Sequence, residues 1–154
     1  MEDMIGFPIV GDWATFSTRI GLALLAGLLI GFEREWHRKP AGLRTHALVS
    51  VGACVYVVLG LILVGEEGGD PSRIIGQVVT GVGFLGAGVI FRQGANIQGL
   101  TTAATIWCSA AVGCLLATGL YVEAALASVA ILLVNSLLKA IEDRLVKSDH
   151  QPKG

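Results

Sequence analysis

The chain has 154 residues, of which 53% are apolar and 15% are charged, and its formal net charge is −1. Soluble domains carry about 25% charged residues, so the composition indicates a protein that lies mostly inside a lipid bilayer. A nucleic-acid-binding protein needs a basic face on a soluble domain. We therefore expect no nucleic-acid partner.

Five apolar segments follow one another along the chain, each about as long as a helix that crosses a hydrocarbon core of roughly 30 Å. They are too long for the strands of a membrane barrel. The sequence predicts an all-α, polytopic bundle of five transmembrane helices at 15–32, 43–64, 74–91, 100–118 and 120–138.

The remaining residues predict two short flanking segments. Residues 1–14 form an extracytoplasmic segment, 15–140 the membrane domain, and 141–154 a cytoplasmic helical extension with a polar tail. No basic region precedes the first apolar stretch, so we expect no cleaved signal peptide.

The first predicted helix carries a glycine pair that favours close helix packing and an arginine for which an ion-pair partner can be predicted. Gly27 and Gly31 form a GxxxG pair, which lets helices approach closely in lipid. Arg19 lies about one turn inside the first helix, and Glu123 about one turn inside the fifth. An ion pair between Arg19 and Glu123 on the outer side is our hypothesis.

Basic residues divide unequally between the two sides, and in short loops this bias sets the orientation. Nine of the eleven lie on one side, which marks the cytoplasm and predicts an N-out, C-in arrangement in a bacterial inner membrane: Arg34, Arg38, Lys39, Arg44, Arg92, Lys139, Arg144, Lys147 and Lys153.

Polar residues from two stretches, 31–46 and 92–107, meet this inner boundary. Arg44 lies within an apolar run, where an ionisable group is by default paired or functional, and Glu33 is its expected partner. Arg38 and Lys39 are expected to contact anionic headgroups. The threonines either cap a helix or line a polar vestibule open to the cytosol. The candidate cytoplasmic cluster is Glu33, Arg34, Arg44, Thr45, His46, Arg92, Asn96, Gln98, Thr101, Thr102 and Thr105.

The third apolar segment contains a sequence that fits G-x-G-x-x-G, but no acidic residue follows at the spacing that a dinucleotide site requires. Small residues instead recur at helical spacing, with Thr80 among them. We expect this segment to be the central packing helix, with close contacts made by Gly76, Gly81, Gly83, Gly86, Ala87 and Gly88.

Residues with metal-binding or catalytic side chains are scattered. Cys54, Cys108 and Cys114 fall inside predicted helices without metal-type spacing, and no nucleophile with a base recurs on adjacent turns. We expect no metal, no cofactor and no enzymatic activity.

Three blocks carry a resemblance to a known family: AGLRTHALV at 41–49, GVGFLGAGVI at 81–90 and LTTAATIWCSAAVG at 100–113, with Glu33 and Arg34 ahead of them. Together they resemble the MgtC/SapB family of bacterial inner-membrane proteins. The resemblance implies a five-helix membrane domain, an association with magnesium homeostasis or acid adaptation, survival of pathogens in macrophages, and regulation of membrane machinery such as the ATP synthase.

Two departures from the virulence branch of that family favour the SapB-like branch. This chain has Thr101 where the virulence branch has Asn, and it ends at Gly154 without the cytoplasmic ACT-like domain. Both departures weaken the case for the virulence role, which stays among the functions that the resemblance implies.

Two functions remain open at this stage. The first is a non-enzymatic regulator that contacts a membrane protein partner and forms a homo-oligomer, with a dimer favoured. The second is a transporter or channel for magnesium or another ion. No Asp or Glu lies in the middle of a predicted helix, which disfavours a dedicated magnesium path.

Overall fold

The structure is a computed structural model that describes residues 13–67 and 69–138. The predicted flanking segments 1–14 and 141–154 lie almost wholly outside these residues. The described chain consists of five helices with a two-stranded hairpin between the third and the fourth: α1 Trp13–Trp36, α2 Leu43–Glu67, α3 Pro71–Gly88, β1 Phe91–Gln93, β2 Asn96–Gln98, α4 Leu100–Ala117, α5 Tyr121–Leu133 and a π-helical turn η1 Val134–Leu138.

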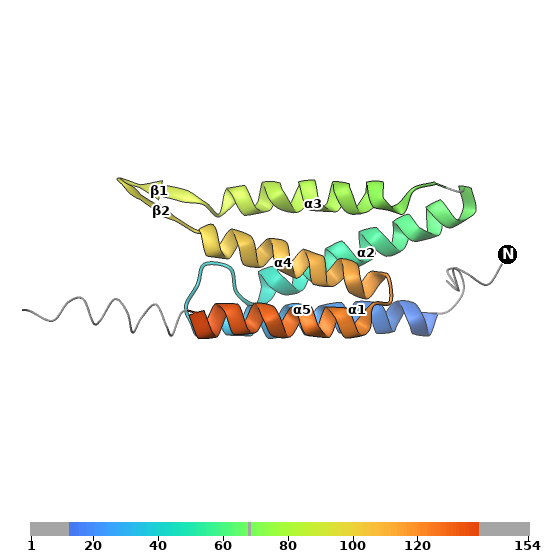
Figure 1. Ribbon diagram of the computed structural model, residues 1–154, viewed down its shortest axis with the longest axis horizontal. Coiled ribbons are helices and arrows are strands. Elements are labelled where there is room, and N and C mark those ends of the chain that lie inside the picture. The colour runs from blue at the N-terminus through green and yellow to red at the C-terminus, as the bar shows by residue number, and fades with distance from the viewer. Residues whose placement is uncertain (1–12, 68, 139–154) are drawn as a thin grey trace, which may run out of the picture.

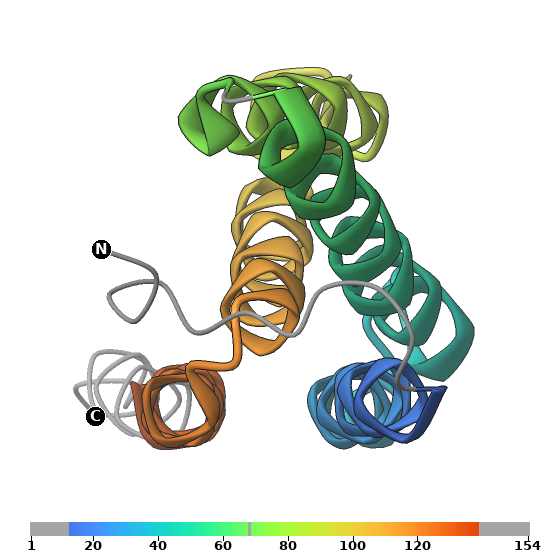
Figure 2. The ribbon, with the colours of Figure 1, turned by 90° about the vertical axis from the view of Figure 1, so that its right-hand side faces the viewer.

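The helices lie roughly along the long axis of the molecule, and the segments that connect them lie at its two ends (Figure 1). One end, which we call the hairpin end, carries the α1–α2 loop, the β-hairpin and η1; the other carries the α2–α3 and α4–α5 turns. Seen along the helices, α1 and α5 occupy one side, α3 the opposite side, and α2 and α4 lie between them (Figure 2). The predicted all-α membrane bundle is confirmed.

Membrane-spanning length and apolarity are shared by four helical segments of the described chain: Trp13–Trp36, Leu43–Val64, Leu100–Ala117 and Tyr121–Leu138. Helix α3 is not among them. Its first half carries the polar side chains of Arg73 and Gln77.

The α1–α2 interface depends on the GxxxG pair. A Cβ at Gly27 would lie 2.6 Å from the His46 carbonyl oxygen, and a Cβ at Gly31 would lie 2.6 Å from the Leu43 Cα. Real Cβ atoms do not approach backbone this closely, so glycine is required at both positions. The GxxxG face is therefore occupied by α2 of the same chain.

Helix α4, and not α3, is the central helix. It packs against α1, α2, α3 and α5, and a Cβ at Gly113 would overlap the Ser50 carbonyl oxygen of α2. On α3, a Cβ at Gly76, Gly81, Gly83 or Gly88 would meet no described atom within 4 Å. The expectation that these four glycines make close contacts fails within the chain, because α3 lies at the edge and touches only α2 and α4 closely.

One member of the predicted α3 face does lie at an interface. A Cβ at Gly86 would lie 3.6 Å from the Ala103 Cβ on α4, and Gly86 is buried. Ala87 is exposed. Helix α3 thus turns most of its small residues away from the bundle.

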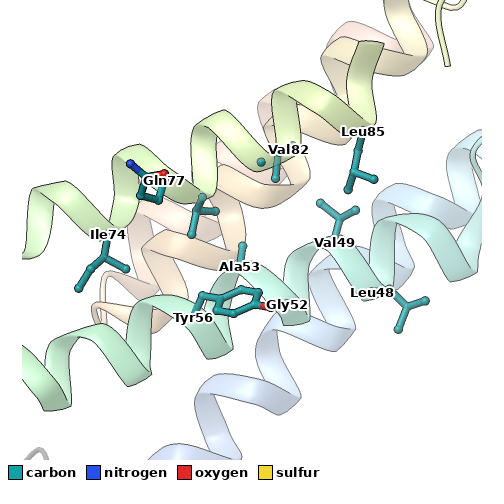
Figure 3. A pocket seen from close by; sticks show the side chains of 11 residues that line it. Leu48, Val49, Gly52, Ala53, Tyr56, Ile74, Gln77, Val82 and Leu85 are labelled. Atoms are coloured by element: carbon teal, nitrogen blue, oxygen red, sulfur yellow. The ribbon is translucent and has the colours of Figure 1, made fainter. Parts of the chain in front are cut away.

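An open apolar groove separates α3 from α2 along part of their length (Figure 3). Its volume is about 430 Å³, and Gln77 and Tyr56 are among the residues that line it. A second groove of about 370 Å³ lies between α3 and α4, where Trp107 forms part of the wall. Open apolar space therefore borders α3 on the sides that face α2 and α4.

The connection between the third and fourth predicted helices, 92–99, contains a short β-hairpin. Arg92 pairs with Ile97, and Gly94 adopts a positive φ of 62° at the turn. Gly99 follows with φ 89°, and a Cβ there would overlap the Val89 carbonyl oxygen. The hairpin thus holds the end of α3 against the start of α4.

Candidate functional site

Seven buried polar residues from four elements form a continuous polar seam inside the hairpin-end half of the bundle. Each is at most 9% exposed. Because they lie between helices of membrane-spanning length, their polar atoms lack bulk water and need partners within the protein. We define the polar seam as Arg34 of α1, His46 and Ser50 of α2, Thr102, Thr105 and Ser109 of α4, and Asn135 of η1.

Helical spacing brings these side chains to one place. Thr102, Thr105 and Ser109 follow at i, i+3 and i+7 and so share one face of α4. His46 and Ser50 are one turn apart on α2, which lies against that face. The seam extends about 10 Å along α4, at 1.5 Å per residue from Thr102 to Ser109.

Two hydrogen bonds join α4 to its neighbours. The Arg34 guanidinium donates from Nη2 to Thr102 Oγ1 at 2.8 Å. The His46 Nδ1 and the Ser109 Oγ are also 2.8 Å apart. These bonds fix the register of α1 and α2 against α4, because each joins side chains far apart in sequence.

The third junction of the seam connects α4 to η1. Thr105 Oγ1 lies 3.4 Å from Asn135 Oδ1, while the same hydroxyl donates to the Thr101 carbonyl at 2.8 Å. A hydroxyl has one proton, so the contact with Asn135 is the weaker of the two. Asn135 lies in a π-helical turn, and such turns are frequent at functional sites.

Four polar atoms of the seam have no hydrogen-bond partner among the described residues, although each is fully shielded from solvent. They are Arg34 Nε, His46 Nε2, Ser50 Oγ and Asn135 Nδ2. Unpartnered buried groups are rare in native proteins and call for an explanation.

Part of the predicted cytoplasmic cluster is thereby brought together. Arg34, His46, Thr102 and Thr105 belong to the seam, and Glu33 and Thr45 are half-buried nearby along the chain. The others are exposed at the hairpin end or on the hairpin itself and do not join the seam: Arg44, Arg92, Asn96, Gln98 and Thr101.

The structure does not show the predicted ion pairs between Glu33 and Arg44 and between Arg19 and Glu123. Glu33 Oε1 pairs with His37 Nδ1 at 2.8 Å, one turn further along α1, whereas Arg44 is exposed. On the opposite end, the Arg19 guanidinium lies beside Gly119 of the α4–α5 turn. Glu123 is exposed in the first turn of α5, where a carboxylate favours the helix N-terminus.

Three members of the seam were not among the residues predicted from the sequence. Ser109 continues the face begun by Thr102 and Thr105, Ser50 lies one turn after His46, and Asn135 is the one amide in the fifth apolar segment. The signal was present in each case as a polar residue at helical spacing within an apolar helix.

The chemistry available in the seam is hydrogen bonding around one cation. Arg34 is its one permanently charged member, and no carboxylate belongs to it. In residues 13–67 and 69–138, no group of three or more His, Cys, Asp or Glu side chains is placed to hold a metal ion.

Asp70 caps α3 outside the membrane-spanning segments, and hydrogen bonds act on its carboxylate. Its Oδ1 accepts from the Ser72 amide at 2.9 Å and its Oδ2 accepts from the Ser72 hydroxyl at 2.8 Å. Hydrogen bonds to the charged form stabilise it, so the pKa of Asp70 lies below its ordinary value.

The fold and the seam define a polytopic helical membrane protein. The family model described as the MgtC family matches residues 20–144. This chain belongs to the MgtC family.

Relatives from several bacteria agree with this assignment. Protein MgtC of Brucella abortus (strain 2308) is 52% identical over 77% of this chain and 49% of its own length. Protein MgtC of Salmonella typhimurium (strain LT2) is 47% identical over 94% of this chain and 58% of its own length. The uncharacterized protein slr0014 of Synechocystis is 40% identical over 92% of this chain and 58% of its own length. The chain thus spans about half the length of the curated relatives it matches, and no solved structure matches it.

Proposed function

We propose that this chain is a non-enzymatic regulator in the bacterial inner membrane that acts through contact with other membrane proteins, such as the ATP synthase or transporters. The association with magnesium homeostasis, acid adaptation or virulence that the family resemblance implies is part of this proposal. So is the N-out, C-in orientation, which puts the hairpin end in the cytoplasm.

The observation that carries the proposal is the character of the polar seam. A path for Mg²⁺ needs oxygen ligands, usually including one or two carboxylates. The seam offers a guanidinium and no carboxylate, and a cation that entered it would meet the buried charge of Arg34. This arrangement favours regulation over the alternative of a magnesium transporter or channel.

The position of α3 supports contact with a neighbour. Its small face, with Gly76 and Gly83, lies open within the chain, and small residues let helices pack closely in lipid. The GxxxG pair of α1 is already occupied by α2. We therefore assign the proposed homo-oligomer contact, with a dimer favoured, to α3.

Flux measurements test the first part. Purified protein in proteoliposomes, with a magnesium-sensitive dye inside and an imposed proton gradient, is expected to give no Mg²⁺ entry above protein-free vesicles. Entry that increases when Arg34 is changed to Gln, at unchanged reconstitution, would establish a cation path through the seam and overturn the regulator proposal.

Cysteine cross-linking in native membranes tests the second part. In a background without Cys54, Cys108 and Cys114, a Gly83→Cys variant is expected to form a disulfide-linked dimer under mild oxidation. Gly21→Cys is the matched control, because Gly21 is an equally open glycine on α1. Cross-linking at position 21 but not at 83 would place the contact on α1 instead.

A further inference from the structure

The groove between α2 and α3 has the length of one leaflet of a bilayer (Figure 3). Its walls are almost wholly apolar, and its α2 wall belongs to the segment of membrane-spanning length Leu43–Val64. Along α3 it extends from Ile74 to Leu85, which is about 17 Å at 1.5 Å per residue. Half of a hydrocarbon core of roughly 30 Å is about 15 Å deep. An apolar molecule of that leaflet can therefore lie along the whole groove.

The width of the groove suits a single hydrocarbon chain and not a helix. A volume of about 430 Å³ over a length of about 17 Å gives a mean cross-section of about 25 Å², whereas a helix about 10 Å across occupies roughly 80 Å². The walls also carry large exposed side chains, those of Leu48, Tyr56 and Leu85. Such side chains hold the backbone of another helix at a distance, because close helix contacts in lipid need small residues.

Protein contacts of α2 and α3 use other residues than those of the groove. Helix α1 packs against α2 at Leu43 and Ala47, and neither of them lines the groove. The small face proposed as the oligomer contact of α3 contains Gly76 and Gly83, which do not line it either. The groove therefore stays open to lipid when both of these contacts are made.

A cationic side chain stands one helical turn beyond the hairpin end of the groove. Arg44 precedes Leu48 by four residues, and Gly52 and Tyr56 continue the same strip of α2 at the same interval. Arg44 is exposed and forms no ion pair or hydrogen bond with any residue that the structure describes. A guanidinium in this position attracts anionic lipid and can donate two parallel hydrogen bonds to a phosphate.

We propose that the α2–α3 groove binds one acyl chain of an anionic phospholipid whose phosphate is held by Arg44. Helix α3 then contacts a bound lipid on one side and is free to contact protein on the opposite side. The proposal goes beyond the regulatory function and does not depend on it, because it concerns the lipid neighbour of the chain and not its protein partner.

The role of Arg44 is tested by native mass spectrometry of protein released from nanodiscs that contain equal amounts of phosphatidylglycerol and phosphatidylcholine. The unaltered chain is expected to retain phosphatidylglycerol in preference, and Arg44→Gln to reduce that preference about fivefold, the worth of one arginine at an anionic surface. Arg38→Gln is the matched control, since Arg38 is exposed at the same end and does not line the groove. Equal reductions in both variants would overturn the proposal, because they would show a general attraction to basic residues.

The groove itself is tested by filling it. Gly52 lines the groove, and a Cβ there would meet no described atom within 4 Å, so Gly52→Leu adds a side chain without crowding the backbone. This variant is expected to keep its midpoint temperature of unfolding and to lose the retained phosphatidylglycerol. Gly21→Leu is the matched control, because Gly21 is an equally open glycine on α1, outside the groove. Undiminished retention in Gly52→Leu would overturn the proposal.

Photo-labelling of the unaltered protein identifies the occupant directly. Phosphatidylglycerol with a diazirine in one acyl chain, in nanodiscs, is expected to label residues 48–56 and 74–85, which hold the lining residues of the groove. Labelling spread evenly over all lipid-facing helices would overturn the proposal. So would efficient disulfide-linked dimers of a Leu48→Cys variant in a background without the native cysteines, because a second copy of the chain would then cover the groove.

Discussion

Helices α3 and α4 have the same length, 18 residues each, and both are rich in small residues, yet they occupy opposite environments. Nine residues of α4 are buried, against two of α3, Val82 and Gly86. Helix α4 has three of its four Ser and Thr side chains inside the bundle, whereas α3 has four of its five glycines on open faces.

The difference shows what a small residue means in a membrane helix. On α4, Gly113 is required because the α2 backbone lies directly against it. On α3, Gly83 faces no described atom, so the fold of the single chain does not require it. A small face permits close packing, but only the position of a neighbouring backbone shows that it is used.

The largest expected effect is the difference in stability between alanine substitutions at Gly113 and at Gly83. Gly113→Ala forces a methyl group into the Ser50 carbonyl and should lower the free energy of unfolding by about 3 kcal/mol. Gly83→Ala should leave it within about 1 kcal/mol of the unaltered protein. Unfolding in mixed detergent micelles measures both, and equal losses would mean that α3 packs as tightly as α4.

The two neighbouring threonines at the start of α4 should also differ. Thr102→Val removes the acceptor of the Arg34 guanidinium and leaves a buried charge short of a bond, at a cost of about 2 kcal/mol. Thr101→Val alters an exposed side chain of the same shape and should change stability by less than about 0.5 kcal/mol. The same micelle unfolding assay compares them, and a larger loss at position 101 would contradict the position of the seam.

Larger side chains on α3 distinguish its two faces. Gly86→Leu crowds Ala103 and should destabilise the single chain by about 1 kcal/mol. Gly83→Leu should leave the fold intact and reduce only the dimer proposed for α3. Unfolding, and disulfide cross-linking through an added Gly76→Cys change on the same helix, separate the effects. An unchanged dimer in Gly83→Leu would remove that face from the proposed contact.

The smallest expected effect concerns the cap of α3. The pKa of Asp70 is lower in the folded protein than the ordinary aspartate value of 3.8. The cap therefore contributes its full stability above pH 3.8, and this contribution is lost as the pH falls through the lower folded-state pKa. Asp70→Asn keeps a capping side chain without the titration. The midpoint temperature of the unaltered protein should therefore fall more steeply below pH 4 than that of the variant, and parallel curves would contradict this.

The helices could be predicted from the sequence because apolar length alone defines them, and the boundaries of 100–118 and 43–64 lie close to those of α4 and α2. Their arrangement could not be predicted in the same way. Glycine spacing on α3 and on α1 gives the same signal, but only α1 meets a backbone. The hairpin was missed because its strands have three residues each, too few to show a period.

Four of the seven seam residues were predicted from the sequence. Polar residues near the end of an apolar segment are easily recognised in a sequence as boundary residues. These four are Arg34, His46, Thr102 and Thr105. Ser109 and Asn135 lie deeper, and a single hydroxyl or amide inside a long apolar run does not reveal which way it faces. The pairing of Glu33 with His37 instead of Arg44 follows from the extension of α1 to Trp36, which places His37 one turn beyond Glu33.

The π-helical turn at Val134–Leu138 has a geometric consequence of its own. A π turn holds about one residue more than an α turn, so within Val134–Leu138 the side chains depart from the roughly 100° step of an α-helix. Deletion of one residue from 136–138 would let the turn relax to α-helical pitch and turn Asn135 relative to Thr105. The amide of Asn135 therefore stands where the side chains that continue α5 leave the angular phase of an α-helix.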